Sequence, residues 1–326
     1  MPTVFALHET WFTDERPGFD WGFTFDASTA LLIGLAIVVA IVWRLIGKAW
    51  RKPELAFLEP LGRLAPYVPR LLAIHAGVSL LAQSYGGTYL APGLDLPAGA
   101  FGTLLGILEG VVGVWLITGF RIRPAAWLLI VAGPLGMVGY GPVPILERLD
   151  LLGIAAFLII LPPSDETAGA VHPSPQLVAT SLMVLRLMVG GSLVILAFTE
   201  KLARPDLAYA FLDDFPAFNI LEALGLGVSD EVFVRMAGAT ELLFGLLIIS
   251  GALPQLAVIV AGIPFNATLF FLGSSELIGH LPIYGAMLAL LIYGSNRMYA
   301  PAVPKFTGLP IRSLFARRSG QGWAAT

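Results

Sequence analysis

The chain has 326 residues, of which 57% are hydrophobic and only 13% are charged, and its formal net charge is -3. Soluble domains carry about 25% charged residues, so this chain needs lipid around it, and its weak charge without a long basic run excludes nucleic acid as a partner. It has no cysteine, which excludes disulfides, thiol catalysis and cysteine-bound metal centres.

Residues 1–28 precede the first long apolar stretch and are rich in acidic and aromatic side chains. A signal peptide begins with basic residues, so these residues do not match one. Their aromatic rings suit a segment at the membrane surface, and a mobile tail is the alternative. We therefore expect 1–28 to be an external N-terminal segment.

About nine stretches have the roughly 20 mainly apolar residues that a helix needs to cross a bilayer. They lie near residues 29–47, 68–84, 100–119, 124–141, 146–162, 178–200, 232–251, 254–273 and 276–294. The fourth and eighth contain Pro134 and Pro264, which membrane helices tolerate when neighbouring groups satisfy the freed carbonyl. The sequence thus predicts an all-α polytopic membrane bundle of about nine spans.

Basic residues gather in three loops that fall on one side of the membrane if there are nine spans. They are Arg44, Lys48, Arg51, Lys52, Arg63 and Arg70, then Arg121 and Arg123, then Arg297, Lys305, Arg312, Arg317 and Arg318. The long segment 201–231 falls on the other side and is net acidic. Because cytoplasmic loops carry the excess of Lys and Arg, we expect the N-terminus outside and the C-terminus in the cytoplasm.

The motif E-x3-G-x5-G occurs twice, beginning at Glu109 and at Glu241. The tetrapeptide IVAG follows each copy, at 130–133 and 259–262, and another glutamate follows at the same distance in both. A charged residue at the bilayer centre costs about 2.5–3.5 kcal/mol, so matched glutamates inside spans predict a duplication. Each copy has four spans, so the two repeats share one orientation and are related by an axis along the membrane normal.

This duplication divides the chain into a first helix and two four-helix units. The predicted parts are the external segment 1–28, the first transmembrane helix with its basic loop at 29–66, repeat 1 at 67–163, a linker at 164–183, repeat 2 at 184–295, and a basic cytoplasmic tail at 296–326.

Polar residues of the second unit are predicted to surround one outward-facing pocket. Glu241 lies near the midplane and forms its floor, where a carboxyl must be protonated, paired or facing a polar cavity. Lys201, Glu276 and His280 are the candidate catalytic residues beside it, while Glu200, Asn266 and Arg186 are candidates for binding a cofactor. The alternative is that these groups only join helices by hydrogen bonds or meet water and headgroups.

The matching residues of the first unit are Glu109, Glu147 and Arg70, but this unit has Gln83 and Ser84 where the second has Glu200 and Lys201. The second unit is therefore the better candidate for a working site. Glycines such as Gly113 and Gly245 are interpreted as helix-packing positions.

A haem or a metal is not expected. Only His75 and His280 lie in or near spans, at opposite ends of their helices, so they do not share one iron. With no cysteine and few histidines, the chain also lacks the usual ligands of a transition metal.

The second unit resembles the DoxX/DoxD family of small four-helix membrane proteins over about residues 184–294. The resemblance rests on Arg186-Leu187 with Gly190-Gly191, on Glu200-Lys201-Leu202, on Gly238-x-x-Glu241-x3-Gly245 with Gly251, and on Glu276 with Pro282-x-x-Gly285. The first unit looks like a degenerate copy. The resemblance implies a helical bundle in the cytoplasmic membrane of a bacterium or archaeon, and some family members are subunits of a thiosulfate:quinone oxidoreductase or belong to membrane redox complexes.

Three functions follow as hypotheses. The first is a membrane subunit of a quinone-linked oxidoreductase, in which Glu241 exchanges the proton and Lys201 or His280 holds a quinone carbonyl. A protein partner then supplies the electrons. The second is a proton-coupled transporter of a small molecule or lipid. The third is a non-catalytic anchor, whose acidic and aromatic segment 201–231 docks an extracytoplasmic partner.

Overall fold

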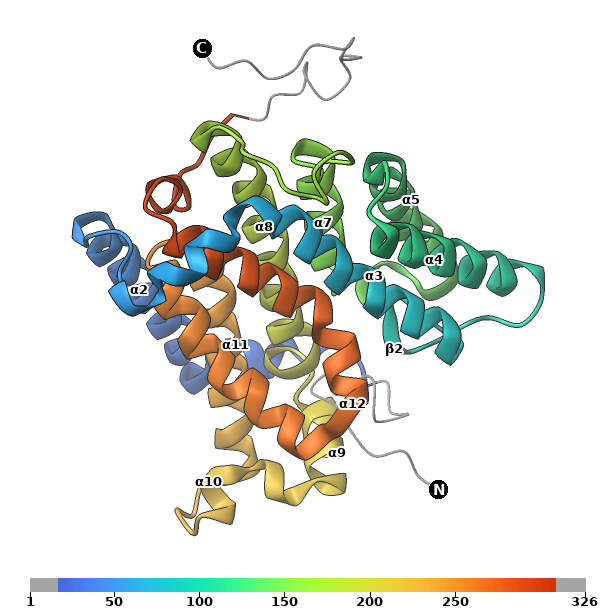
Figure 1. Ribbon diagram of the computed structural model, residues 1–326. Helices are drawn as coiled ribbons and strands as arrows, with labels where there is room; N and C mark the ends of the chain where they lie inside the picture. Colours follow the sequence, from blue (N-terminus) through green and yellow to red (C-terminus); the bar gives the residue numbers. More distant parts are fainter. Residues whose placement is uncertain (1–16, 309–326) are drawn as a thin grey trace.

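The computed structural model describes residues 17–308, without the side chains of residues 268 and 270–275 (Figure 1). Most of the predicted external segment and the last three arginines of the predicted tail lie outside the described residues. The described part is almost entirely helical, which confirms an all-α polytopic helical bundle.

Seven described helical stretches are long and apolar enough to cross a membrane. They are Ala27–Ala49 (α2), Ala56–Gly86 (η2 with α3), Ala100–Thr118 (α4), Ile122–Tyr140 (α5), Pro175–Leu202 (α8 with η3), Asp230–Ser250 (α11) and Glu276–Ser295, the second part of α12. The predicted fifth and eighth spans correspond to shorter apolar helices, Leu149–Ile160 (α7) and Pro254–Ala267 in the first part of α12.

Shorter elements connect the long helices. They are α1 (Trp21–Phe25), the 3-10 helix η2 (Ala56–Tyr67) leading into α3 (Val68–Gly86), the antiparallel hairpin of β1 (Thr88–Tyr89) and β2 (Ala91–Asp95), α6 (Pro142–Leu146), the π-helix η3 (Ala197–Leu202) ending α8 (Pro175–Leu196), α9 (Pro205–Asp214), η4 (Pro216–Phe218), α10 (Ile220–Ala223) and η5 (Ala300–Ala302).

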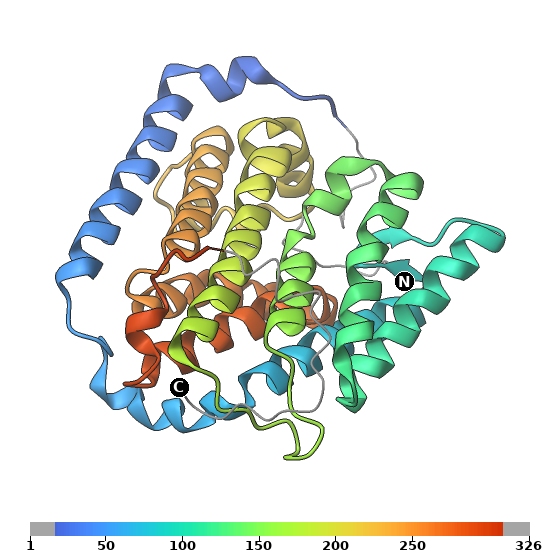
Figure 2. The same ribbon diagram turned by 90° about the horizontal axis from the view of Figure 1, so that it is seen from above.

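Six helices form a row, crossed by α3 and by the second part of α12. The order of the row is α2, α11, α8, α7, α5 and α4, and each helix contacts the next. Figure 2 shows α2 at one edge of the row and α4 with α5 at the other. Both edges expose apolar side chains such as Leu31, Leu35, Ile107 and Val111, as expected for helices facing lipid.

Helix α12 (Pro254–Ser295) folds back on itself. A straight helix of its 42 residues would be about 63 Å long, twice the thickness of the bilayer core. Instead the hydroxyl of Tyr284 donates to the carbonyl of Phe265 over 2.9 Å, and the amide of Gln255 donates to the hydroxyl of Ser295 over 2.8 Å. The two arms therefore lie side by side and run antiparallel, as Figure 1 shows, and they correspond to the predicted eighth and ninth spans.

The first two helices of each predicted unit cross at a pair of glycines. A Cβ added at Gly77 would lie 2.8 Å from the carbonyl oxygen of Gly113, and one added at Gly190 would lie 2.5 Å from that of Gly245. Small residues let helix backbones approach this closely in membranes. The expected packing role of these glycines matches the geometry in both units.

The last helix of each unit packs against the first helix of the other. Helix α7 contacts α8, where the hydroxyl of Ser192 donates to the carbonyl of Glu147. Helix α12 contacts α3, where the hydroxyl of Ser79 donates to the carbonyl of Ile278 over 2.8 Å. These reciprocal contacts support the predicted duplication and bring polar residues of the two units together.

Two arginines cap the second helix of each unit at matching places. Arg70 donates to the carbonyls of Leu116 and Ile117, and Arg186 donates to that of Ile249. The helices that they cap end in left-handed glycines at positions 119 and 251. Orphan carbonyls at a helix end need such donors, and the cationic side chains also suit the negative end of the helix dipole.

The predicted cytoplasmic end holds several basic residues in the described structure. Arg44 donates to the carbonyl of Ser250 at the end of α11, and Arg297 forms an ion pair with Glu59 at 2.8 Å. In the loop before η2, Glu54 accepts a hydrogen bond from the backbone of Gln255, and burial raises the pKa of this carboxyl. The orientation across the membrane remains a prediction.

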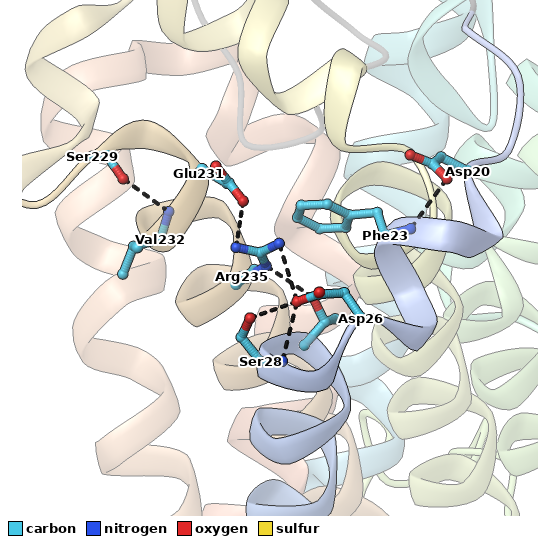
Figure 3. Close-up of polar contacts among 9 residues, drawn as sticks. Asp20, Phe23, Asp26, Ser28, Ser229, Glu231, Val232 and Arg235 are labelled. Carbon is cyan, nitrogen blue, oxygen red and sulfur yellow. Dashed lines mark hydrogen bonds and ion pairs between the residues drawn. The ribbon is translucent and has the colours of Figure 1, made fainter.

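At the opposite end, a polar clamp joins the start of α2 to the start of α11 (Figure 3). Arg235 pairs with Asp26 at 3.3 Å and with Glu231 at 2.5 Å, and its guanidinium lies over the ring of Phe23. Asp26 also caps α2, and hydrogen bonds from Ser28 hold the pKa of its carboxyl below the ordinary value of 3.8. The clamp fixes α2 beside α11.

Candidate functional site

A cavity of about 340 Å³ lies in the second unit, between the predicted outer segment and the long helices. This volume lies at the lower end of the range for small-molecule sites. Most of its wall is apolar, and its charged or titratable side chains are Lys201, Glu241 and His280. The apolar wall consists of Leu193, Leu196, Phe211, Leu212, Phe218, Ile220, Leu221, Phe233, Val234, Met236, Ala237, Phe244, Pro264 and Phe265, with Thr240 beside them.

Lys201 and Glu241 form an ion pair in the cavity wall, with 3.3 Å between Nζ and the nearer carboxylate oxygen. Glu241 is the twelfth residue of α11, about 16 Å from the helix start, and so lies near its middle. Its side chain keeps 22% of its surface accessible because it opens on the cavity. The structure therefore brings these two predicted site residues together.

The backbone of η3 lets Lys201 reach this position. Residues 197–202 form a π-helix, a rare conformation that often occurs at functional sites. A Cβ added at Gly238 would lie 3.1 Å from the Cβ of Lys201 and 2.7 Å from Cγ of Leu202, so only glycine allows η3 to lie this close to α11. The predicted motif Gly238-x-x-Glu241 thus has a packing explanation.

His280 and Glu276 lie one turn apart on the second arm of α12, as predicted. Nδ1 of His280 lies 3.3 Å from the carboxylate of Glu276, and both residues are buried. The ring of His280 meets that of Phe265 edge to face, with 5.4 Å between centroids. His280 faces the cavity, whereas Glu276 lies behind it and orients the imidazole.

The segment after η3 closes the cavity at the predicted outer end. Helices α9 and α10 contribute apolar side chains such as Phe211, Leu212 and Leu221 to its wall. Segment 201–231 was expected to dock a partner, and its role in the cavity wall was not predicted. A signal was present: Phe211, Leu212 and Phe215 recur at helical spacing in an otherwise acidic segment, which is typical of an amphipathic helix over a core.

Two of the predicted cofactor-binding residues lie elsewhere. Asn266 is exposed, and its amide donates to the carbonyl of Gly262 on the same helix over 2.7 Å. Arg186 lies fifteen residues before Lys201, about 22 Å along the helix, where it caps α11 and also donates to the carbonyl of Lys305. Periodicity could not separate these positions, because neither the outward rotation of Asn266 nor the cap can be read from residue type.

The matching carboxyl of the first unit accepts a hydrogen bond from the protein's own backbone. Glu109 is buried and accepts a hydrogen bond of 2.8 Å from the backbone of Leu90, in the β1–β2 hairpin. Leu90 has a positive φ of 61°, a strained conformation that aims this N–H at the carboxyl. The hairpin thus supplies Glu109 with a donor, as Lys201 does for Glu241 in the second unit.

Glu147 was predicted to belong to a pocket of the first unit, and the structure corrects this placement. It lies within electrostatic range of Glu200 of the second unit, because α7 packs against α8 as well as against α5 of its own unit. Glu200 itself lies 3.9 Å from Nζ of Lys201 and behind the cavity wall. Arg70, like Arg186, is a helix cap.

Comparison of the chain with protein-family models, curated proteins and solved structures finds no match. The class of protein therefore follows from the fold and the site alone. It is an α-helical membrane protein with a largely apolar cavity whose wall contains one lysine–glutamate pair and a histidine.

Proposed function

We propose that this protein is the membrane subunit of a quinone-linked oxidoreductase and that its cavity binds the quinone. The observation that carries the proposal is the Lys201–Glu241 ion pair in the wall of an otherwise apolar cavity. An isoprenoid quinone has the same division of character, with a polar head that accepts hydrogen bonds and an apolar tail. The DoxX/DoxD resemblance of residues 184–294 points to the same class of function.

The three polar side chains suit the two parts of quinone reduction. The ammonium of Lys201 and the imidazole of His280 can donate hydrogen bonds to a quinone carbonyl. Reduction to quinol takes up two electrons and two protons, and Glu241 can deliver a proton to the reduced oxygen. The electrons come from a redox partner protein, for which the acidic outer segment after η3 is the proposed docking surface.

A calorimetric measurement of the affinity for decylubiquinone, with the protein in lipid nanodiscs, tests the proposal. A charge-assisted hydrogen bond is worth about 1.5–3 kcal/mol, so Lys201→Met should weaken binding by roughly 10-fold to 100-fold. Glu109→Gln is the matched control in the first unit and should bind normally. Equal affinity of Lys201→Met and the wild type would rule out this site.

Turnover tests the role of Glu241 separately. With the redox partner present, Glu241→Gln should bind decylubiquinone but abolish quinone-dependent turnover while leaving the thermal stability of the protein unchanged. Normal turnover in this variant would exclude Glu241 as the proton donor.

A proton-coupled transporter is the second candidate, and the ionisable groups of the cavity wall favour it. Glu241 lies near the middle of α11 and pairs with Lys201 at 3.3 Å. Ionisable residues inside membrane spans often mark the proton and substrate pathways of carriers. Uptake driven by a proton gradient into proteoliposomes without any redox partner would favour transport over the oxidoreductase.

A further inference from the structure

A second group of ionisable side chains lies buried where the two units meet, behind the cavity wall. The start of α7 contributes Glu147, Arg148 and Asp150, η3 contributes Glu200, and α12 contributes Glu276. Each of these residues has at most 6% of its surface exposed. The quinone-binding proposal uses none of them directly, yet burying charged groups is costly.

The cations of this region are shared among several carboxyls. Arg148 lies 3.3 Å from Asp150 and also donates to the carbonyl of Gly279. His280 lies 3.3 Å from Glu276. Lys201 lies between two carboxyls, 3.3 Å from Glu241 and 3.9 Å from Glu200.

Glu147 lies within electrostatic range of Glu200 across the junction, and also of Arg148 and Arg204. Altogether five carboxyls (Glu147, Asp150, Glu200, Glu241 and Glu276) meet Arg148, Lys201, Arg204 and the histidine His280. The negative groups therefore outnumber the positive ones even when the histidine is protonated. Two ionised carboxylates within electrostatic range of each other repel in a medium of low dielectric, and one proton held by the pair removes that repulsion.

The backbone around the pair is irregular on both sides. Glu200 lies in the π-helix η3, and Glu147 lies at the break between α6 and α7, where the hydroxyl of Ser192 holds its carbonyl. The two acidic residues, one from each unit, thus both lie in irregular segments of the backbone.

We propose that Glu147 and Glu200 share one proton and that Lys201 connects this proton store to Glu241 in the cavity. In the transfer, the ammonium of Lys201 gives a proton to the Glu241 carboxylate, and the neutral amine then takes the shared proton from Glu200. The pair is left with both carboxylates ionised and is protonated again from water. No electron moves in these steps, so the store exists whether or not the cavity binds a quinone.

Infrared spectroscopy of the protein in nanodiscs measures the store, because only a protonated carboxyl has a C=O stretch that shifts in D2O. At neutral pH, Glu147→Gln and Glu200→Gln should each remove the absorbance of one carboxyl per chain. The double variant should remove one as well, since the two residues share a single proton. Glu222→Gln, at the exposed outer segment, is the control and should remove none.

Other results would overturn the proposal. Loss of two carboxyls in the double variant would mean that each residue is protonated independently, and loss of none would mean that both are ionised. If the double variant does not fold, the spectra of the two single variants distinguish the two cases. A shared proton predicts that the spectra of Glu147→Gln and Glu200→Gln superimpose. Independent protonation predicts that each single variant keeps the C=O band of the carboxyl that was not replaced. Unchanged quinone affinity in these variants leaves the infrared result intact, so the two proposals fail separately.

Discussion

Replacing Gly245 by alanine should destabilise the protein, because this glycine lies where the backbones of α8 and α11 approach closely. A Cβ added there would lie 2.7 Å from the carbonyl oxygen of Gly190 and 2.9 Å from a methyl group of Val194. An ordinary contact of about 3.4 Å requires the helices to part by roughly 0.7 Å. Such overpacking costs about 1–3 kcal/mol.

Alanine also favours a helix over glycine by about 1 kcal/mol, so a matched control is needed. Gly34 lies on the exposed face of α2, where an added Cβ meets nothing within 4 Å. Gly34→Ala gains the same helix propensity without the clash. The difference in free energy of unfolding between the two variants therefore isolates packing, and we expect about 1–3 kcal/mol.

Unfolding by sodium dodecyl sulfate in mixed micelles, followed by tryptophan fluorescence, measures this difference. Gly113→Ala in the first unit should behave like Gly245→Ala, because an added Cβ there would lie 2.9 Å from the carbonyl of Gly77. Equal stability of Gly245→Ala and Gly34→Ala would refute the close crossing and, with it, the position of Glu241 one turn away.

Three further variants test other contacts. Arg186→Met removes the donors to the carbonyls of Ile249 and Lys305. Each buried acceptor left unpaired costs about 1–3 kcal/mol, so the free energy of unfolding should fall by at least about 2 kcal/mol. A smaller loss in the same detergent titration would disprove the cap. Burial raises the pKa of Glu54 above 4.5, so its favourable contribution to the free energy of unfolding is complete below that pH and is lost as the pH rises through the folded-state pKa. The melting temperature of Glu54→Gln should therefore rise relative to that of the wild type between about pH 4 and pH 8. A difference in melting temperature that stays constant over this range would contradict the prediction. The lowered pKa of Asp26 means that its contribution is lost only as the pH falls below 3.8; Asp26→Asn should speed hydrogen exchange in the first turn of α2 at neutral pH, and unchanged exchange would argue against the clamp with Arg235.

The sequence predicted the fold well because bilayer physics leaves few choices. Long apolar stretches form helices, and the nine predicted stretches correspond to the seven long and two short apolar helices of the described chain. The length of α7 could not be predicted, because hydropathy does not show the break before it, and hydropathy does not show the bend in α12 either. Matched glutamates also indicated the duplication, which the paired contacts of Arg70 and Arg186 support.

The candidate site was predicted only in part. The pairing of Lys201 with Glu241 follows from tracing the helices antiparallel, which places η3 beside α11. The position of Glu147 does not follow, because the sequence cannot show that the last helix of one unit packs on the first helix of the other. The donor from the strained Leu90 to Glu109 was equally invisible, since a backbone N–H has no signature in residue type.

The most direct test of the account is to identify what occupies the cavity after gentle purification. The protein is extracted from its membrane in mild detergent, and the bound lipids and co-purifying proteins are identified by mass spectrometry. Ala237, in the cavity wall, provides the matched variant, because tryptophan at this position fills part of the 340 Å³. We predict a quinone in near-stoichiometric amount with the wild type and its loss from a folded Ala237→Trp variant. A wild-type protein without quinone, or equal quinone in both proteins, would contradict the account.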